Sequence, residues 1–151
     1  LGLTGLAGGA AVAGCCANMV GFAVLSFREN RWGGLVSQGL GTSMLQIPNL
    51  MRKPVLWLPA VAASLVGGPL ATCVFHLEQN GFAIASGMGT CGLVGPIGVI
   101  VGWVNGDGAT AWDIVGLILV AIVVPALVSW AVSELMRRRG LIKPGDYKLD
   151  L

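Results

Sequence analysis

The sequence predicts an all-α, polytopic transmembrane protein that contains broken or re-entrant helical hairpins. Of its 151 residues, 55% are hydrophobic and 11% are charged, whereas soluble domains carry about 25% charged residues. The mean hydropathy is +0.81. Three apolar runs are long enough to cross a hydrocarbon layer of about 30 Å. These runs are Leu3–Phe27, Val55–Phe75 and Ile114–Ser133.

Two further segments, Trp32–Pro54 and Gly81–Val104, are apolar but interrupted by glycine and proline. Each contains too many helix-breaking residues to form one straight helix. Irregular backbone at membrane depth is tolerated only where it is buried in protein or lines a polar cavity. We therefore expect both segments to be re-entrant hairpins or broken helices.

Basic residues follow the first apolar run, precede the second and follow the third. Such residues favour the cytoplasmic side of a membrane. All three clusters reach that side only if each broken segment returns to the face from which it enters, so the two hairpins must enter from opposite faces. Paired interrupted segments indicate a substrate site near the midplane. The basic residues are Arg28 and Arg31, Arg52 and Lys53, and Arg137, Arg138 and Arg139.

The two broken segments share a short pattern. Residues 39–43 read Gly-Leu-Gly-Thr-Ser and residues 87–91 read Gly-Met-Gly-Thr-Cys. Pro48 and Pro96 each lie nine positions after the first glycine of their string. A structural repeat and a chance match both explain this pattern, because the chain contains 24 glycines.

A polar string at positions 76–80 lies between the second apolar run and the second broken segment. It contains Glu78, Asn80 and His76, the one histidine of the chain. Titratable groups near membrane depth are costly and usually functional. A carboxylate accepts hydrogen bonds and an amide both donates and accepts them, which suits the hydroxyl groups of a substrate. A solvated external loop is the alternative.

The glycine-rich string of the second broken segment, residues 87–92, offers a second set of polar groups, namely those of its backbone. Gly87, Gly89 and Thr90 are the candidate substrate contacts there, with tight helix packing as the alternative. Gln46 and Asn49 of the first broken segment are expected to line the same cavity. These five residues and the polar string complete the predicted substrate site.

Other polar and aromatic residues have structural explanations. Asn18, inside the first run, is a further candidate for the cavity lining, and an interhelical hydrogen bond is its preferred explanation. Four tryptophans lie near the ends of predicted segments and are typical of interfacial anchors rather than sugar-stacking platforms. They are Trp57, Trp103, Trp112 and Trp130.

Several function classes lack support. The four cysteines follow no zinc or redox spacing, and the chain contains no Walker motif or nucleophile elbow. The net charge of +2 is too small to indicate a nucleic-acid partner. We expect no catalytic residue, no metal and no cofactor in this chain.

The ends of the sequence suggest its organisation. It begins within an apolar run and lacks the charged region of a signal peptide. We expect that upstream membrane segments precede this piece and that the charged tail from Lys143 is the natural C-terminus. Residues 1–139 form the predicted transmembrane domain, and residues 140–151 form a cytoplasmic tail.

Several ungapped strings resemble, in order, the bacterial phosphotransferase-system sugar permease subunit IIC family, in the branch that includes proposed toxin-regulating membrane proteins. The resemblance covers nearly the whole chain and about the C-terminal half of a full-length member. The strings are Gln46-Ile47-Pro48-Asn49, Lys53-Pro54, Trp57-Leu58-Pro59, Gly68-Pro69-Leu70-Ala71-Thr72, Glu78-Gln79-Asn80, residues 87–95 and residues 145–151.

The resemblance implies a multi-pass protein of the bacterial inner membrane that binds a sugar and moves it inward. A cytoplasmic phospho-IIB partner, supplied by IIA, would phosphorylate the sugar, so phosphotransferase activity requires these partners. The residues that this resemblance implies as sugar contacts are Glu78, Asn80 and residues 87–92. We expect a lipid-embedded homodimer. A non-transporting membrane regulator or sensor with the same fold is the alternative, and an unrelated channel or transporter is a third possibility.

Overall fold

The computed structural model describes residues 2, 4–106 and 108–149. Within this part the chain is helical and has no β-strand, so the predicted all-α class is confirmed. The α-helices are α1 (Gly5–Val36), α2 (Ile47–Arg52), α3 (Leu58–Pro69), α4 (Val94–Asn105), α5 (Ala111–Ile118) and α6 (Val124–Arg138). Short 3-10 turns cover Ser43–Gln46, Pro54–Trp57, Ala83–Gly87 and Cys91–Leu93, and π-turns cover Ser37–Gly41, Leu70–Val74 and Leu119–Val123.

Three helical stretches are long and apolar enough to cross a membrane, and they contain nearly all of the three predicted runs. They cover Gly5–Gly41, Pro54–Val74 and Ala111–Arg138. In the last stretch the π-turn joins α5 to α6 directly before Pro125. Proline has no backbone N–H to donate, so the hydrogen-bond ladder must change at that point. Of the predicted first run, Leu3 lies outside the described residues.

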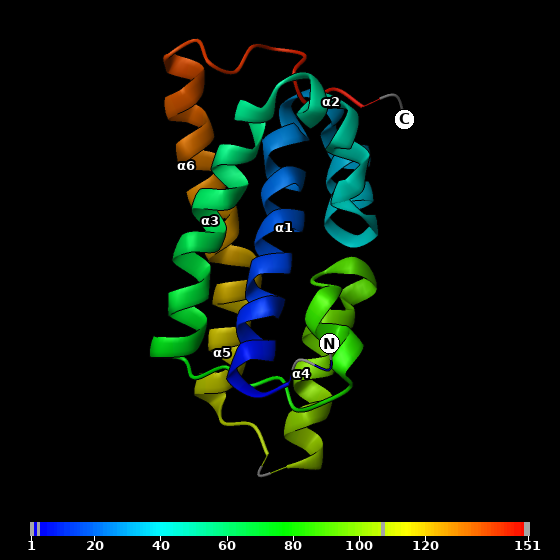
Figure 1. The fold of residues 1–151 in the computed structure, drawn as a ribbon, viewed down its shortest axis with the longest axis vertical. Coiled ribbons are helices and arrows are strands. Elements are labelled where there is room, and N and C mark those ends of the chain that lie inside the picture. The colour runs from blue at the N-terminus through cyan, green and yellow to red at the C-terminus, as the bar shows by residue number, and fades with distance from the viewer. Residues whose placement is uncertain (1, 3, 107, 150–151) are drawn as a thin grey trace.

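The first broken segment forms a hairpin, which we call hairpin 1 (residues 32–53). Helix α1 breaks at Arg31, where φ is 51° and ψ is −142°. The chain then runs back beside α1, turns at the extended residue Thr42 and returns through α2 to the end from which it came (Figure 1). The sequence prediction of a re-entrant segment is confirmed here, although its first arm continues α1 after the break.

The second broken segment forms hairpin 2 (residues 81–105), which enters from the opposite end of the molecule. Residues 83–87 run toward the middle, the chain reverses over residues 88–92, and α4 returns to the end of entry (Figure 1). The two hairpins therefore enter from opposite ends, as the placement of the basic residues predicts.

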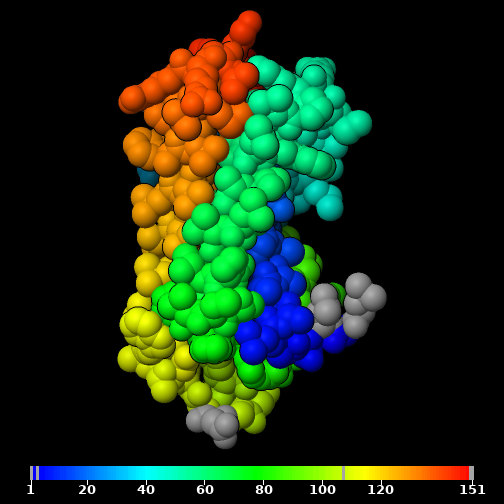
Figure 2. All heavy atoms as spheres, turned by 60° about the vertical axis from the view of Figure 1, so that its left-hand side comes forward, coloured from blue at the N-terminus to red at the C-terminus, as the bar shows by residue number. Residues whose placement is uncertain are grey.

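All three basic clusters lie at one end of the molecule, which we call the basic end. Ion pairs at this end join α1 to α6 and join Lys53 to the C-terminal segment, residues 140–149. The C-terminal segment covers the same end and packs beside the residues that precede α3 (Figure 2). The pairs are Arg28–Glu134 at 3.0 Å, Arg137–Glu29 at 3.4 Å and Lys53–Asp146 at 2.6 Å.

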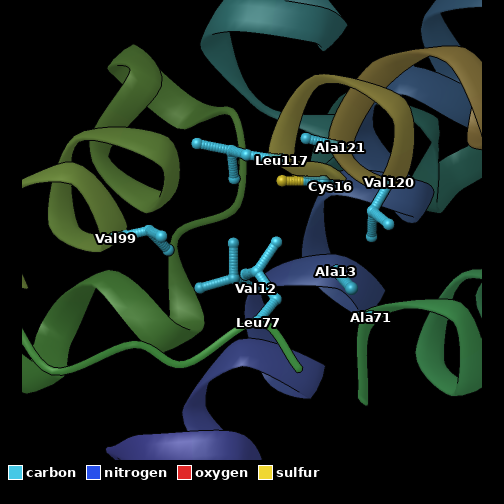
Figure 3. Packing of buried hydrophobic residues seen from close by; sticks show 9 residues of the cluster. All are labelled: Val12, Ala13, Cys16, Ala71, Leu77, Val99, Leu117, Val120 and Ala121. Atoms are coloured by element: carbon cyan, nitrogen blue, oxygen red, sulfur yellow. The ribbon is translucent and has the colours of Figure 1, made fainter. Parts of the chain in front are cut away.

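The core beside α1 consists of alanine, cysteine, valine and leucine side chains from several parts of the chain (Figure 3). Small residues let helices approach closely where lipid surrounds the protein. Many other apolar side chains face outward, with Leu65 71% exposed and Val104 77% exposed. Lipid tails are as apolar as these side chains, so their exposure indicates a membrane surface. The core residues are Val12, Ala13, Cys16, Ala71, Leu77, Val99, Leu117, Val120 and Ala121.

Candidate functional site

The tips of the two hairpins meet near the middle of the molecule. The Thr90 hydroxyl of hairpin 2 donates a hydrogen bond of 2.6 Å to the carbonyl oxygen of Gly39 in hairpin 1. Both residues belong to the glycine-rich strings that share a sequence pattern. The two similar strings therefore lie where each hairpin reverses, and the contact joins elements that enter from opposite ends (Figure 1).

Residues with positive φ angles produce the reversal of hairpin 2. Gly89 has φ +54°, and Gly92 and Leu93 follow with φ 54° and 59°. L-residues rarely adopt this conformation, whereas glycine adopts it at little cost. The tip also packs closely on α1, because a Cβ atom at Gly89 would lie 2.7 Å from the Cys15 carbonyl carbon. Glycine is required at position 89 for both reasons.

Backbone carbonyls of the same tip face the side of α1. The Cys15 thiol lies 3.6 Å from the carbonyl oxygen of Gly87 and 3.8 Å from that of Ser86. A cavity of about 370 Å³ opens beside them and is lined by Cys15, Ser86 and Gly87 with apolar neighbours. Gly87 is exposed, whereas Gly89 and Thr90 are buried. The tip therefore places backbone carbonyls beside this cavity, near the middle of the molecule.

The polar string lies at the opposite end from the basic clusters. Glu78 and Asn80 are exposed, and the Asn80 amide donates a hydrogen bond of 2.9 Å to the Glu78 carboxylate. His76 is also exposed and has φ 44°. A non-glycine residue in that region stores backbone strain, which is common at functional sites. The structure thus brings these three candidates together in one loop.

Between the exposed residues of this loop, Gln79 is fully buried. Its backbone pairs with Gly5 through hydrogen bonds of 2.8 and 3.0 Å. Its side-chain amide donates to the Phe82 carbonyl at 2.7 Å, while the Oε1 atom is buried without a partner in the described part of the chain. Gln79 therefore anchors the loop to the start of α1, a role that the sequence interpretation missed.

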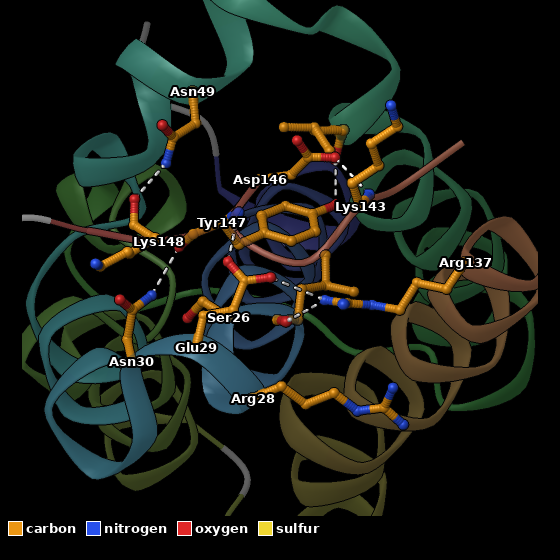
Figure 4. A network of polar contacts seen from close by, with 12 residues as sticks. Ser26, Arg28, Glu29, Asn30, Asn49, Arg137, Lys143, Asp146, Tyr147 and Lys148 are labelled. Atoms are coloured by element: carbon orange, nitrogen blue, oxygen red, sulfur yellow. Dashed lines mark hydrogen bonds and ion pairs between the residues drawn. The ribbon is translucent and has the colours of Figure 1, made fainter. Parts of the chain in front are cut away.

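Gln46 and Asn49 do not join the other candidates, which corrects the expectation of one shared cavity. Gln46 is buried and donates 3.1 Å to the carbonyl of Tyr147, and Asn49 donates 2.9 Å to both Gln46 and the carbonyl of Lys148. These bonds occur at the basic end, and Figure 4 shows the bond from Asn49 to Lys148. Both amides hold the C-terminal segment against hairpin 1.

The C-terminal segment is packed against the bundle around Tyr147, which is fully buried. The Tyr147 hydroxyl donates 2.9 Å to the Leu56 carbonyl, and its backbone N–H donates 2.7 Å to Glu29. Asn30 bonds the carbonyl of Tyr147 and the N–H of Leu149 (Figure 4). Residues 146–149 therefore link the end of α1, hairpin 1 and the start of α3.

Charges strengthen this packing. Burial alone would raise the pKa of the Asp146 carboxyl, but hydrogen bonds from the Lys53 ammonium and the Lys143 backbone N–H hold that pKa below its ordinary value. Burial raises the pKa of the Tyr147 phenol, so Tyr147 stays neutral. Glu29 is compensated by Arg137 at 3.4 Å. The basic end thus contains a satisfied polar network.

The described residues contain no group of three or more His, Cys, Asp or Glu side chains placed to hold a metal ion. The four cysteines are free thiols. The candidate residues in the exposed loop and at the tip of hairpin 2 offer one hydroxyl, one amide, one carboxylate, one imidazole and backbone groups. Such groups recognise polyhydroxylated ligands through hydrogen bonds.

Comparison with known proteins places the chain in a family. The family model described as "Phosphotransferase system, EIIC" matches residues 1–149. No curated protein and no solved structure matches the chain. The family match covers both hairpins, the polar string and the C-terminal segment.

Proposed function

The chain belongs to the phosphotransferase system EIIC family, and we propose that it binds a sugar and moves it inward for phosphorylation by a cytoplasmic phospho-IIB partner. The family and the three apolar helices make it a membrane permease subunit. In this proposal the chain contributes no phosphorylated residue. The IIA and IIB subunits supply the phosphoryl group, and this chain binds, orients and releases the sugar.

One observation supports this proposal most strongly, namely the meeting of two hairpins from opposite ends at mid-depth. Interrupted helices with that arrangement characterise transporters whose substrate site lies near the midplane. The Thr90–Gly39 hydrogen bond of 2.6 Å joins the tips, so parting them opens a path along α1. The substrate site then opens alternately to the two sides of the membrane when one hairpin moves relative to the other.

We assign the sugar contacts to two places along this path. Glu78, Asn80 and His76 form a polar entrance, where the carboxylate accepts hydrogen bonds from sugar hydroxyls. Backbone groups of Gly87 and Gly89, with the Thr90 hydroxyl, receive the sugar at the tips. Gln46 and Asn49 act indirectly, because they bond the C-terminal segment and so fix the position of hairpin 1.

The basic end faces the cytoplasm in this proposal, because positive residues favour that side. The polar entrance then faces outward, and residues 140–149 lie where cytoplasmic subunits approach. The protein is a multi-pass component of the bacterial inner membrane and works as a homodimer.

Uptake of a labelled sugar by intact cells, with and without phosphoenolpyruvate-dependent phosphorylation, tests the whole proposal. Sugar binding without any uptake would favour the regulatory alternative.

Replacing Glu78 with glutamine tests the entrance. Hydrogen bonds to a charged group are about twice as strong as neutral ones. Losing such a bond costs on the order of 1.5–3 kcal/mol, which is about a tenfold to hundredfold loss of affinity. We expect that loss in equilibrium sugar binding to the purified protein, with normal membrane insertion. Glu134→Gln, which alters a partly buried carboxylate that pairs with Arg28 at the basic end, serves as the control. Unchanged affinity in Glu78→Gln would contradict the assignment.

A further inference from the structure

Asn18 occupies an unusual position in the middle of the first membrane-crossing helix. It lies thirteen positions after Gly5, where α1 begins, and thirteen positions before the break at Arg31. At a rise of 1.5 Å per residue, it lies about 20 Å from both points. Its side chain is exposed and makes no hydrogen bond within the described part of the chain. The interhelical hydrogen bond expected for Asn18 is therefore absent from that part.

Asn18 lines a cavity of about 280 Å³ between α1, hairpin 1 and the start of α3. Ser43, directly after the tip of hairpin 1, lines the same cavity, and its hydroxyl also has no hydrogen-bond partner among the described residues. The neighbouring Thr42 side chain accepts from the Met44 N–H, so the turn does not need Ser43. Two uncommitted polar groups from facing elements thus share one cavity.

Trp57 and apolar side chains form the rest of the wall. Trp57 is 55% exposed and lines the cavity together with residues such as Phe22 and Val61. Ligand pockets are mostly apolar with a few placed polar groups, and those for drug-sized ligands have volumes of about 300–1,000 Å³. The smaller volume here suits one sugar ring rather than an oligosaccharide.

The chemistry of the wall favours one occupant over two others. A sugar ring has hydroxyls around its rim and C–H groups on its faces, so it satisfies the Asn18 amide and the Ser43 hydroxyl while it covers the Trp57 ring. A lipid tail leaves both polar groups without partners, which is costly at the centre of a bilayer. A membrane helix resolves this only if it brings matching polar side chains.

We propose that the cavity lined by Asn18, Ser43 and Trp57 binds a single sugar ring on the cytoplasmic side of the hairpin tips. This inference rests on the proposed function and extends it, because it assigns an inner sugar site distinct from the Glu78 entrance. Asn18 donates and accepts hydrogen bonds to vicinal hydroxyls, Ser43 contributes one more, and Trp57 stacks on the ring face. Trp57 is then more than an interfacial anchor.

Sugar protection of a cysteine at position 18 tests the site in the full protein. The experiment starts from a cysteine-free protein in which Cys15, Cys16, Cys73 and Cys91 are replaced by alanine. This protein must still bind at least one sugar from a radiolabelled panel of hexoses, hexitols and N-acetylhexosamines. Asn18→Cys in inverted membrane vesicles is treated with a maleimide that does not cross lipid. We expect labelling that the bound sugar slows at least tenfold.

Leu65→Cys is the control for lipid exposure, because Leu65 is 71% exposed on α3 and does not line the cavity. It should resist the maleimide with or without sugar. If Asn18→Cys also resists labelling, a helix or lipid covers the position and the proposal is wrong. Labelling that the sugar does not slow would overturn it as well.

Affinity measurements complete the test without the cysteine-free background. Asn18→Leu and Trp57→Leu should each lower sugar affinity about tenfold to a hundredfold. Trp130→Leu should leave it unchanged, because Trp130 is similarly exposed at 53% but lies away from the cavity. Wild-type protein that binds no sugar in the panel would refute the proposed function itself. Wild-type binding with unchanged affinity in both cavity variants would refute only the inner site.

Discussion

Replacing Gly89 with leucine is expected to abolish sugar uptake. Gly89 has φ +54° at the tip of hairpin 2, where a side chain would be strained in any rotamer. The space is also filled, because a Cβ atom there would lie 2.7 Å from the Cys15 carbonyl carbon and 2.9 Å from the Cys16 nitrogen. Both are backbone atoms of α1, which cannot move aside as a flexible side chain could. The tip must therefore withdraw from α1.

Uptake per inserted molecule is the measurement, and Gly68→Leu is the matched control. Gly68 lies in α3, where an added Cβ meets nothing within 4 Å. Gly89→Ala should already impair uptake, because one methyl group suffices for the clash. If Gly89→Leu assembles poorly, the Gly89→Ala protein supplies the same test. Uptake at wild-type levels in the alanine variant would show that the tip needs no close approach to α1.

Replacing Tyr147 with alanine is expected to lower stability more than any change in an exposed residue of the C-terminal segment. The Tyr147 ring is fully buried between Phe22, whose ring centroid lies 6.4 Å away, and the start of α3. Truncating a buried aromatic side chain to alanine typically costs about 3–5 kcal/mol. Its hydroxyl bond to Leu56 is lost as well. The purified protein should unfold at a clearly lower temperature.

Tyr147→Phe separates the hydrogen bond from the packing. This variant keeps the ring but leaves the Leu56 carbonyl without its side-chain donor, so the expected loss is about 1–3 kcal/mol. Lys148→Ala is the control, because the Lys148 side chain is exposed and only its backbone carbonyl bonds Asn49. Equal unfolding temperatures for Tyr147→Ala and Lys148→Ala would mean that the segment does not hold hairpin 1.

The spans and the hairpins could be predicted because their causes are local. An apolar run of sufficient length requires a membrane, and a run interrupted by Gly39, Gly41 and Pro48 cannot form a straight helix. Charge placement then determined the direction of both hairpins, since Arg52 and Arg137 share one end with Arg28. These deductions needed no knowledge of which side chains touch.

The uses of individual polar residues could not be predicted, because they depend on contacts between distant parts of the chain. Gln46 bonds Tyr147, which lies 101 positions away, so its local sequence gives no sign of that role. Tyr147 itself stands among charged residues typical of a solvated tail. Gln79 and Glu78 are neighbours of similar polarity, yet the loop buries one and exposes the other. Three-dimensional packing decides each case.

Cross-linking of the two hairpin tips tests the central claim most directly. The protein for this experiment carries Gly39→Cys and Thr90→Cys in the cysteine-free background, in native membranes, and is treated with a short bifunctional maleimide. Because Thr90 and Gly39 are joined by a 2.6 Å hydrogen bond, we expect rapid cross-linking within one chain. The control pair, Gly39→Cys with Asn105→Cys, joins one tip to the far end of α4 and should not react. Equal cross-linking of both pairs, or none in either, would contradict hairpins that meet at mid-depth.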